Sequence, residues 1–160
     1  MRIHSFSDAE GVKIAIEMEK RGEAFYRRAA RISRNPETVR MLEQLAAEER
    51  VHGAEFEKLA ACAGIGQEVY DAETNAYLSA IAGDIVFPEG LMALRGTGFD
   101  SPAGALLEAI RSEKDSILFY TELARMTLGD GAKAVFEEIV RQEKGHMRLL
   151  QTRLATITED

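Results

Sequence analysis

Two histidines in this sequence each follow a glutamate by three positions. Glu49 precedes His52, and Glu143 precedes His146. Residues three apart share one face of an α-helix, so both side chains of a pair can reach the same ion. Carboxylate oxygens and imidazole nitrogens together form a donor set that suits divalent first-row metals. The two pairs are therefore candidate metal ligands.

These pairs belong to an internal repeat with a constant offset of 94 residues. A repeat of this length can be a purely structural duplication, so the residue types that recur decide its meaning. They include a glutamate ahead of each pair, Glu19 in the first half and Glu113 in the second. Further matches include Ala15-Ile16 with Ala109-Ile110, Lys20 with Lys114, Phe25-Tyr26 with Phe119-Tyr120, and Glu43 with Glu137.

Helix-start signals indicate the elements that must position these residues. Ser7 and Glu10 have the spacing of a capping box, in which the serine accepts from the backbone and the glutamate reaches back. Asn35-Pro36 and Ser101-Pro102 each combine an N-cap residue with proline at the first helical position. With the glycines that end helices, these signals predict long helices at about residues 8–34, 36–62, 102–128 and 130–157.

The four helices predict an all-α fold, a four-helix bundle made of two helical hairpins. The connections within the hairpins are short, and the crossover at about 63–101 is long, with a short helical segment at about 71–82. A length of 160 residues fits a single domain over 1–160, in which the repeat occupies about 8–62 and 102–157.

The candidate ligands interrupt the apolar stripes that must face the core of the bundle. Glu49 lies in line with Leu42, Leu45 and Phe56, and the other candidates interrupt their own helices in the same way. Four buried carboxylates repel one another, and each costs several kcal/mol to desolvate, unless they are protonated or surround cations. Two divalent ions would balance the four charges, and two imidazoles would complete the ligand set.

The motif set resembles the ferritin-like superfamily, specifically its rubrerythrin-like branch. The resemblance covers nearly the whole chain and implies a ferritin-like bundle with a di-iron carboxylate site. It implies that Glu49 and Glu143 bridge or chelate the metals beside His52 and His146, and that Glu19 and Glu113 are outer or bridging carboxylates. The matching motifs are Glu19-x-x-Gly22-x-x-Phe25-Tyr26 with Glu49-x-x-His52, and Glu113-x-x-Ser116-x-x-Phe119-Tyr120 with Glu143-x-x-His146.

Two departures from the family pattern bear on the expected reaction. Peroxide-reducing rubrerythrins carry an additional carboxylate one turn after the third-helix glutamate, and this chain has Ser116 there. They also usually carry a rubredoxin domain with four cysteines, whereas this chain has one cysteine, Cys62, which we expect to be buried. The resemblance therefore supports a di-metal site in this chain more strongly than it supports peroxidase activity.

Several neighbours of the candidate ligands are expected to support them. Tyr26 and Tyr120 follow Glu19 and Glu113 by about two helical turns, so their hydroxyls could hydrogen-bond a ligand carboxylate across the bundle. The alternative is that they are core tyrosines bonded to any nearby acceptor. Gly22 and Ser116 either leave room for the metals or an oxidant, or allow close helix packing. Glu48 is interpreted as a surface or supporting residue.

The leading functional hypothesis is a di-iron oxidoreductase with two Fe ions per chain. It would oxidise Fe(II) with O₂ or H₂O₂, as a ferroxidase or as a peroxidase with an external electron donor. Manganese or zinc could take the place of iron, because the same ligands suit them. One alternative is a non-redox metal-binding or iron-delivery protein, and another is a structural bundle whose carboxylate core is a relic.

Composition limits the expected partners. A net charge of −7 without a basic stripe argues against nonspecific nucleic-acid binding. No apolar run approaches the ~18–20 residues of a membrane span, and the N-terminus lacks the apolar core of a signal peptide, so we expect a cytoplasmic protein. We also expect a homodimer formed through exposed apolar residues of the crossover, namely Ile81, Ile85, Val86, Phe87, Leu91 and Met92.

Overall fold

The computed structural model describes residues 5–62, 64–83 and 101–157, and within these ranges every regular element is a helix. One hairpin consists of α1 (Asp8–Ile32) and α2 (Pro36–Ala61), and the second of α6 (Pro102–Met126) and α7 (Asp130–Ile157). A short helix, α3 (Ala72–Ile81), follows the first hairpin. The predicted all-α bundle of two hairpins, with a short helix in the crossover, is confirmed.

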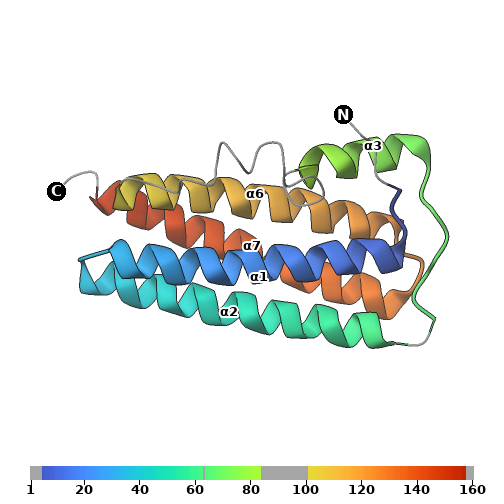
Figure 1. Cartoon of the computed structure of the whole chain (residues 1–160), viewed down its shortest axis with the longest axis horizontal. Coiled ribbons are helices and arrows are strands. Elements are labelled where there is room, and N and C mark those ends of the chain that lie inside the picture. Colours follow the sequence, from blue (N-terminus) through green and yellow to red (C-terminus); the bar gives the residue numbers. More distant parts are fainter. Residues whose placement is uncertain (1–4, 63, 84–100, 158–160) are drawn as a thin grey trace.

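The two hairpins lie side by side, as Figure 1 shows. Within them α1 packs on α2 and α6 packs on α7, while α1 also contacts α6 and α2 contacts α7. α2 ends and α6 begins at opposite ends of the bundle. α3 packs on α6 near the end of the bundle at which α6 terminates.

The predicted start signals make the expected capping contacts. Ser7 Oγ accepts a hydrogen bond from the Glu10 N–H (3.2 Å), and Asn35 Oδ1 accepts from two N–H groups at the start of α2 (2.9 and 3.2 Å). Ser101 Oγ accepts from the Gly104 N–H at 3.0 Å. Helices α1 and α6 end two residues earlier than predicted, because Ser33 and Thr127 adopt extended backbone conformations.

The apolar core is divided into two clusters along the bundle axis. One cluster includes Val12, Phe56, Leu123 and Phe136, and the other includes residues such as Leu42 and Leu106. Each of the four long helices contributes to both clusters, so each end of the bundle has a core of its own. On every long helix the boundary between the clusters falls at the predicted metal ligands, which lie at positions 19, 49 and 52, 113, and 143 and 146.

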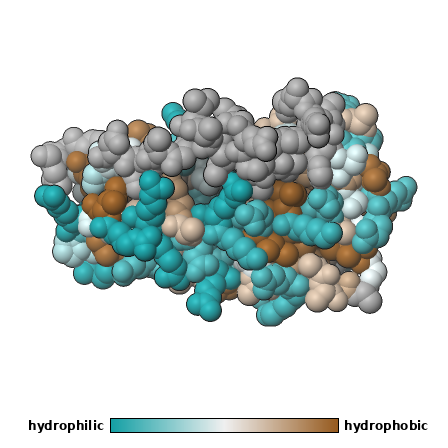
Figure 2. Space-filling view, viewed as in Figure 1, coloured by the Kyte–Doolittle hydropathy of each residue, from teal (hydrophilic) through white to brown (hydrophobic). Residues whose placement is uncertain are grey.

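On the part of the molecular face that is coloured in Figure 2, hydrophilic side chains predominate, with separate hydrophobic patches between them. Among the described residues, no helix is both long enough and apolar enough to cross a membrane. Ile81 was expected to be exposed at a dimer interface, but it is half-buried against the core cluster that contains Val12, because α3 packs on α6. The other five predicted interface residues lie outside the described ranges, and the homodimer stays a prediction.

Replacing Asn35 with alanine should lower the free energy of unfolding by about 1 kcal/mol, because two N–H groups of α2 lose their acceptor. Urea-induced unfolding followed by circular dichroism measures this loss. Asn35→Asp is the control, since it keeps an acceptor oxygen and places a negative charge at the positive end of the helix dipole. Equal losses in both variants would contradict a capping role for this side chain.

Candidate metal centre

The structure brings all six predicted ligands together in one layer of the core. Each of these six residues is at most 5% exposed. The layer separates the two apolar clusters, so water is excluded on both sides of it. Its members are Glu19 from α1, Glu49 and His52 from α2, Glu113 from α6, and Glu143 and His146 from α7.

The candidate ligand atoms of this layer form two overlapping groups. One group contains Glu19, Glu49, His52 and Glu143, and the other contains Glu49, Glu113, Glu143 and His146. Within each group the ligand atoms lie within 4.8 Å of one another. Because Glu49 and Glu143 belong to both groups, the arrangement offers two adjacent ion sites with two shared carboxylates.

Both imidazole rings direct Nδ1 toward the carboxylates. His52 Nδ1 lies 3.2 Å from Glu143 Oε1 and 3.6 Å from Glu19 Oε2. His146 Nδ1 lies 2.9 Å from Glu143 Oε2, 3.0 Å from Glu49 Oε1 and 3.3 Å from Glu113 Oε1. The rings are stacked, with centroids 5.5 Å apart and an interplanar angle of 16°. The Nδ1 atoms are therefore the nitrogens available to ions in this layer.

Buried polar atoms of the layer lack hydrogen-bond partners, which is the observation that tests its fit to a metal. Glu19 Oε2, Glu49 Oε1, Glu143 Oε2 and His146 Nδ1 are buried and make no hydrogen bond of acceptable geometry among the described residues, although His146 Nδ1 lies 2.9 and 3.0 Å from the Glu143 and Glu49 oxygens. Leaving a buried polar atom unpartnered costs about 1–3 kcal/mol, and more when the group is charged. Cations coordinated by these atoms would remove that cost, so the residues present fit a metal centre.

The pKa values of the four glutamates reflect their burial and their closeness to one another. Burial raises the pKa of Glu49 well above its usual range, with repulsion from Glu19 and Glu143 adding to the effect. Burial and the charge of Glu143 also raise the pKa of Glu19, and they raise that of Glu113 to about 8. For Glu143, burial acts in the same direction, but the hydrogen bonds of the two imidazoles outweigh it and lower the pKa.

The imidazoles take up the opposite charge. Burial disfavours protonation of His52, but the adjacent carboxylates of Glu143 and Glu19 outweigh it and raise the pKa to about 10. Burial also opposes protonation of His146, and the carboxylates of Glu113, Glu143 and Glu49 again raise its pKa. In the absence of cations, bound protons therefore reduce the net negative charge of the layer, and a metal must displace them.

Two tyrosines hold the outer carboxylates from the opposite hairpin. Tyr26 on α1 donates a hydrogen bond to Glu113 on α6, and Tyr120 on α6 donates to Glu19 Oε1 on α1 at 2.7 Å. Burial and the nearby carboxylates raise the pKa of both phenols, so they remain protonated donors. The two hydrogen bonds are repeat counterparts, and they fix one oxygen of each carboxylate.

The outer nitrogens of the histidines have partners that the sequence patterns alone did not identify. His52 Nε2 lies 2.7 Å from Gln142 Oε1, and His146 Nε2 lies 2.6 Å from Glu48 Oε2. The sequence left Glu48 open between a surface and a supporting position, and gave no role to Gln142. The available signal was that each of these residues directly precedes the glutamate of a Glu-x-x-His pair.

Gly22 makes room for one of the shared carboxylates. A Cβ atom added at Gly22 would lie 2.7 Å from Glu49 Oε2, too close for an undisturbed contact. The atom it meets is the end of a flexible side chain, so a substitution would move the carboxylate rather than the helix. Of the two interpretations left open by the sequence, space for the metal-binding side chain is the one that this contact supports.

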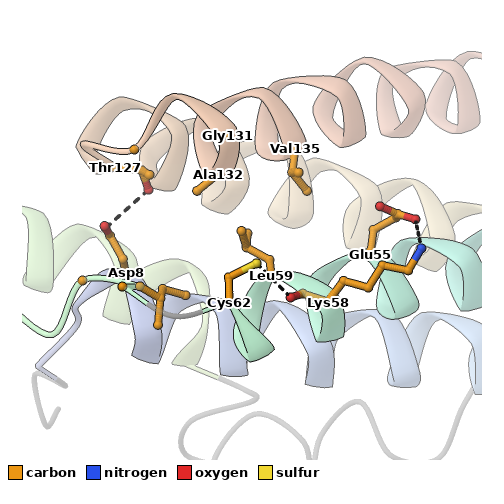
Figure 3. A pocket seen from close by; sticks show the side chains of 13 residues that line it. Asp8, Glu55, Lys58, Leu59, Cys62, Thr127, Gly131, Ala132 and Val135 are labelled. Atoms are coloured by element: carbon orange, nitrogen blue, oxygen red, sulfur yellow. Dashed lines mark hydrogen bonds and ion pairs between the residues drawn. The ribbon is translucent and has the colours of Figure 1, made fainter.

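A cavity of about 400 Å³ lies at the end of the bundle and is separate from the polar layer. Its lining includes Asp8, Leu59, Thr127 and Val135, and none of the six predicted ligands contributes to it (Figure 3). Cys62 also lines this cavity, and it is exposed rather than buried as predicted, because α2 ends at Ala61, one residue before it. The six predicted metal ligands thus lie in the closed core of the bundle and do not line the open cavity.

Four helices around a buried layer of glutamates and histidines define a helical bundle of the ferritin-like type. The chain belongs to the rubrerythrin family, whose sequence profile matches residues 10–95 and 104–160. No curated protein matches the sequence.

Solved structures agree with this assignment. The chain is similar to a protein from Thermotoga maritima provisionally described as a ferritin-like diiron-carboxylate protein, with 28% identity and a TM-score of 0.70, over 96% of this chain and 98% of that one. A hypothetical protein from Pyrococcus furiosus shares the fold at 19% identity and a TM-score of 0.69, over 96% of this chain and 92% of that one.

Gly22→Ala should separate the stability of the bundle from its metal affinity. Alanine raises helix propensity by up to about 1 kcal/mol, so the metal-free variant should unfold at the same or higher urea concentration. Displacement of the Glu49 carboxylate should weaken Co²⁺ binding by about 10-fold, as measured by calorimetry. Gly53→Ala is the matched control, because its Cβ would make only an ordinary 3.5 Å contact with Glu19. Unchanged Co²⁺ affinity in Gly22→Ala would contradict this role.

Metal binding should release protons and become tighter as the pH rises. Glu113, with a pKa of about 8, is mostly protonated at about pH 6.5 and mostly ionised at about pH 8.5. Each Co²⁺ should therefore displace more protons at the lower pH, and its apparent affinity should be lower there. Calorimetry in buffers of different ionisation enthalpy measures both quantities. Binding that releases no protons and is independent of pH would show that the carboxylates are already ionised.

Proposed function

We propose that the chain is a di-iron carboxylate protein that oxidises Fe(II) with O₂ or H₂O₂. The observation that carries this proposal is the pair of overlapping ligand groups that share Glu49 and Glu143, with buried oxygen and nitrogen atoms that make no hydrogen bond of acceptable geometry. The description of the Thermotoga maritima protein, which is matched over almost its whole length, supports the same metal.

In this proposal the two halves of the layer hold one ion each. Glu19 and His52 would hold one ion and Glu113 and His146 the other, and Glu49 and Glu143 belong to both groups of candidate ligands. The tyrosine hydrogen bonds orient the outer carboxylates, because each phenol fixes one oxygen, which in Glu19 leaves Oε2 facing His52. The apolar clusters on either side keep bulk water away from the ions.

The ligand set favours oxidation of the bound metal. An Fe(II) pair supplies two electrons when bound, and with two protons these reduce one H₂O₂ to two water molecules and leave two Fe(III). Four carboxylates in a site of low dielectric constant stabilise the higher charge of the product more than that of the starting ions. Whether Fe(III) is then released or re-reduced by an external donor distinguishes ferroxidase from peroxidase activity.

An anaerobic Fe(II) titration of the metal-free protein, followed by air or H₂O₂, tests this proposal. Binding should saturate at two ions per chain, and the oxidant should produce the near-ultraviolet absorption of bound Fe(III). Glu49→Ala and Glu143→Ala each remove a shared carboxylate, so both variants should bind fewer than two ions and lose fast oxidation. Glu43→Ala is the control, because this residue is an exposed glutamate on the same helix as Glu49.

The other outcomes each contradict the proposal in a different way. Binding of two Fe(II) ions without oxidation would overturn the redox reaction and favour the iron-delivery or metal-carrier alternative. Failure to bind any ion would overturn the metal centre and favour the relic bundle. If oxidation occurs, the faster of the two oxidants identifies the physiological type of reaction.

A further inference from the structure

The two histidines of the polar layer are held by chemically different partners. Glu48 and Gln142 are repeat counterparts, each directly before a shared glutamate, and each contacts the histidine of the opposite hairpin. The distances are nearly equal, 2.6 Å for Glu48 Oε2 to His146 Nε2 and 2.7 Å for Gln142 Oε1 to His52 Nε2. The scaffold is symmetric at this point, and the charge is not.

A second pair of residues extends the difference outward by one hydrogen bond. Gln44 Nε2 donates to Glu48 Oε1 at 2.9 Å, whereas Gln142 Nε2 donates to Glu138 Oε1 at 2.8 Å. Positions 44 and 138 are also repeat counterparts. Each half therefore carries one glutamate and one glutamine four residues apart on the same helix, and their order is reversed between the halves.

The reversed order places a carboxylate directly on one histidine only. On the His52 side, the carboxylate of Glu138 is separated from the ring by the Gln142 amide, and Arg141 donates to both of its oxygens (2.6 and 3.0 Å). On the His146 side, the carboxylate of Glu48 contacts the ring itself. Each arrangement contains one carboxylate, but Glu138 is paired with Arg141 and lies further from its ring than Glu48 does.

Both arrangements also determine which ring nitrogen faces the ions. The Gln142 amide nitrogen is engaged with Glu138, so its oxygen must face His52 and accept a hydrogen bond from Nε2. Glu48 is an acceptor in the same way for His146 Nε2. Once a cation displaces the proton on Nδ1, each Nδ1 would thus present its lone pair to the layer. A carboxylate acceptor makes the opposite nitrogen of an imidazole a stronger metal donor than an amide acceptor does.

An independent difference points in the same direction. His146 Nδ1 lies 2.9 to 3.3 Å from oxygens of three carboxylates, those of Glu49, Glu113 and Glu143, whereas His52 Nδ1 lies 3.2 and 3.6 Å from oxygens of only two. The donor atoms around His146 are therefore gathered more closely, so a cation there would reach them with less movement of the side chains.

We propose that Glu48 and Gln142 are positioning residues that make the two ion sites unequal. The site formed by Glu49, Glu113, Glu143 and His146 binds its divalent cation first and more tightly than the site that contains His52. This inference rests on the proposed metal centre and adds to it an order of loading. The chain distinguishes two otherwise equivalent sites through one carboxyl-to-amide difference outside the ligand set.

A Zn²⁺ titration followed by nitrogen-15 NMR of labelled histidines tests the order, because the chain has only three histidines. Single histidine-to-glutamine variants assign the signals. In the unmodified chain, the ring signals of His146 should shift with the first equivalent of Zn²⁺ and those of His52 with the second. Calorimetry of the same titration gives the two stepwise affinities.

Exchanging the two partners should exchange the order. Glu48→Gln should weaken the first step by about 10-fold or more, and Gln142→Glu should strengthen the second step by a similar factor. The double variant, E48Q with Q142E, should load the His52 site first. Glu138→Gln is the control, since it removes a carboxylate from the same surface one hydrogen bond further from the ring, and it should leave the order unchanged.

The possible failures are distinguishable. Simultaneous shifts of both histidines in the unmodified chain, or an order that the double variant does not reverse, would overturn the inference and leave the metal centre intact. Reversal by Glu138→Gln alone would also overturn it, because surface charge in general would then set the order. Absence of Zn²⁺ binding in every variant would overturn the metal centre itself.

Discussion

The burial of four carboxylates in a single layer is the constraint on which the rest of this structure depends. Without compensation it would separate the helices, because the negative charges repel one another in a medium that screens them weakly. Two histidines, two tyrosine hydroxyls and bound protons or cations provide that compensation. An apolar cluster on each side of the layer, with residues from all four long helices, holds the bundle together while the layer is charged.

The repeat makes the site symmetric in geometry, and a few substitutions make it asymmetric in chemistry. Equivalent positions supply the ligands, the tyrosines and the contacts between hairpins. One such difference is that Gly22 occupies the position equivalent to Ser116, and a Cβ atom at Gly22 would be too close to the Glu49 carboxylate. Another is that Glu48 occupies the position equivalent to Gln142. A duplicated scaffold can thus preserve the positions of two ions while it differentiates their surroundings.

Much of this arrangement could be predicted from the sequence, because the start of a helix and its buried face are both marked by local sequence patterns. The caps at Ser7, Asn35 and Ser101 and the acidic interruptions of apolar stripes are local patterns, and the structure brings the six interrupting residues together. The partners of the histidine rings were not predictable in the same way, since they join residues about 90 positions apart on different hairpins. The exposure of Cys62 and the partial burial of Ile81 likewise depend on where α2 ends and on what α3 packs against.

Each hairpin carries half of the polar layer and completes the other half's hydrogen bonds. Tyr26 and Glu48 in the first hairpin serve Glu113 and His146 in the second, and the reverse contacts are made by their counterparts. A single ancestral hairpin that paired with its own copy would therefore already have enclosed a complete set of ligands. In a single chain that joins two such copies the halves are free to differ, so one half can carry a glutamate where the other carries a glutamine, as at positions 48 and 142.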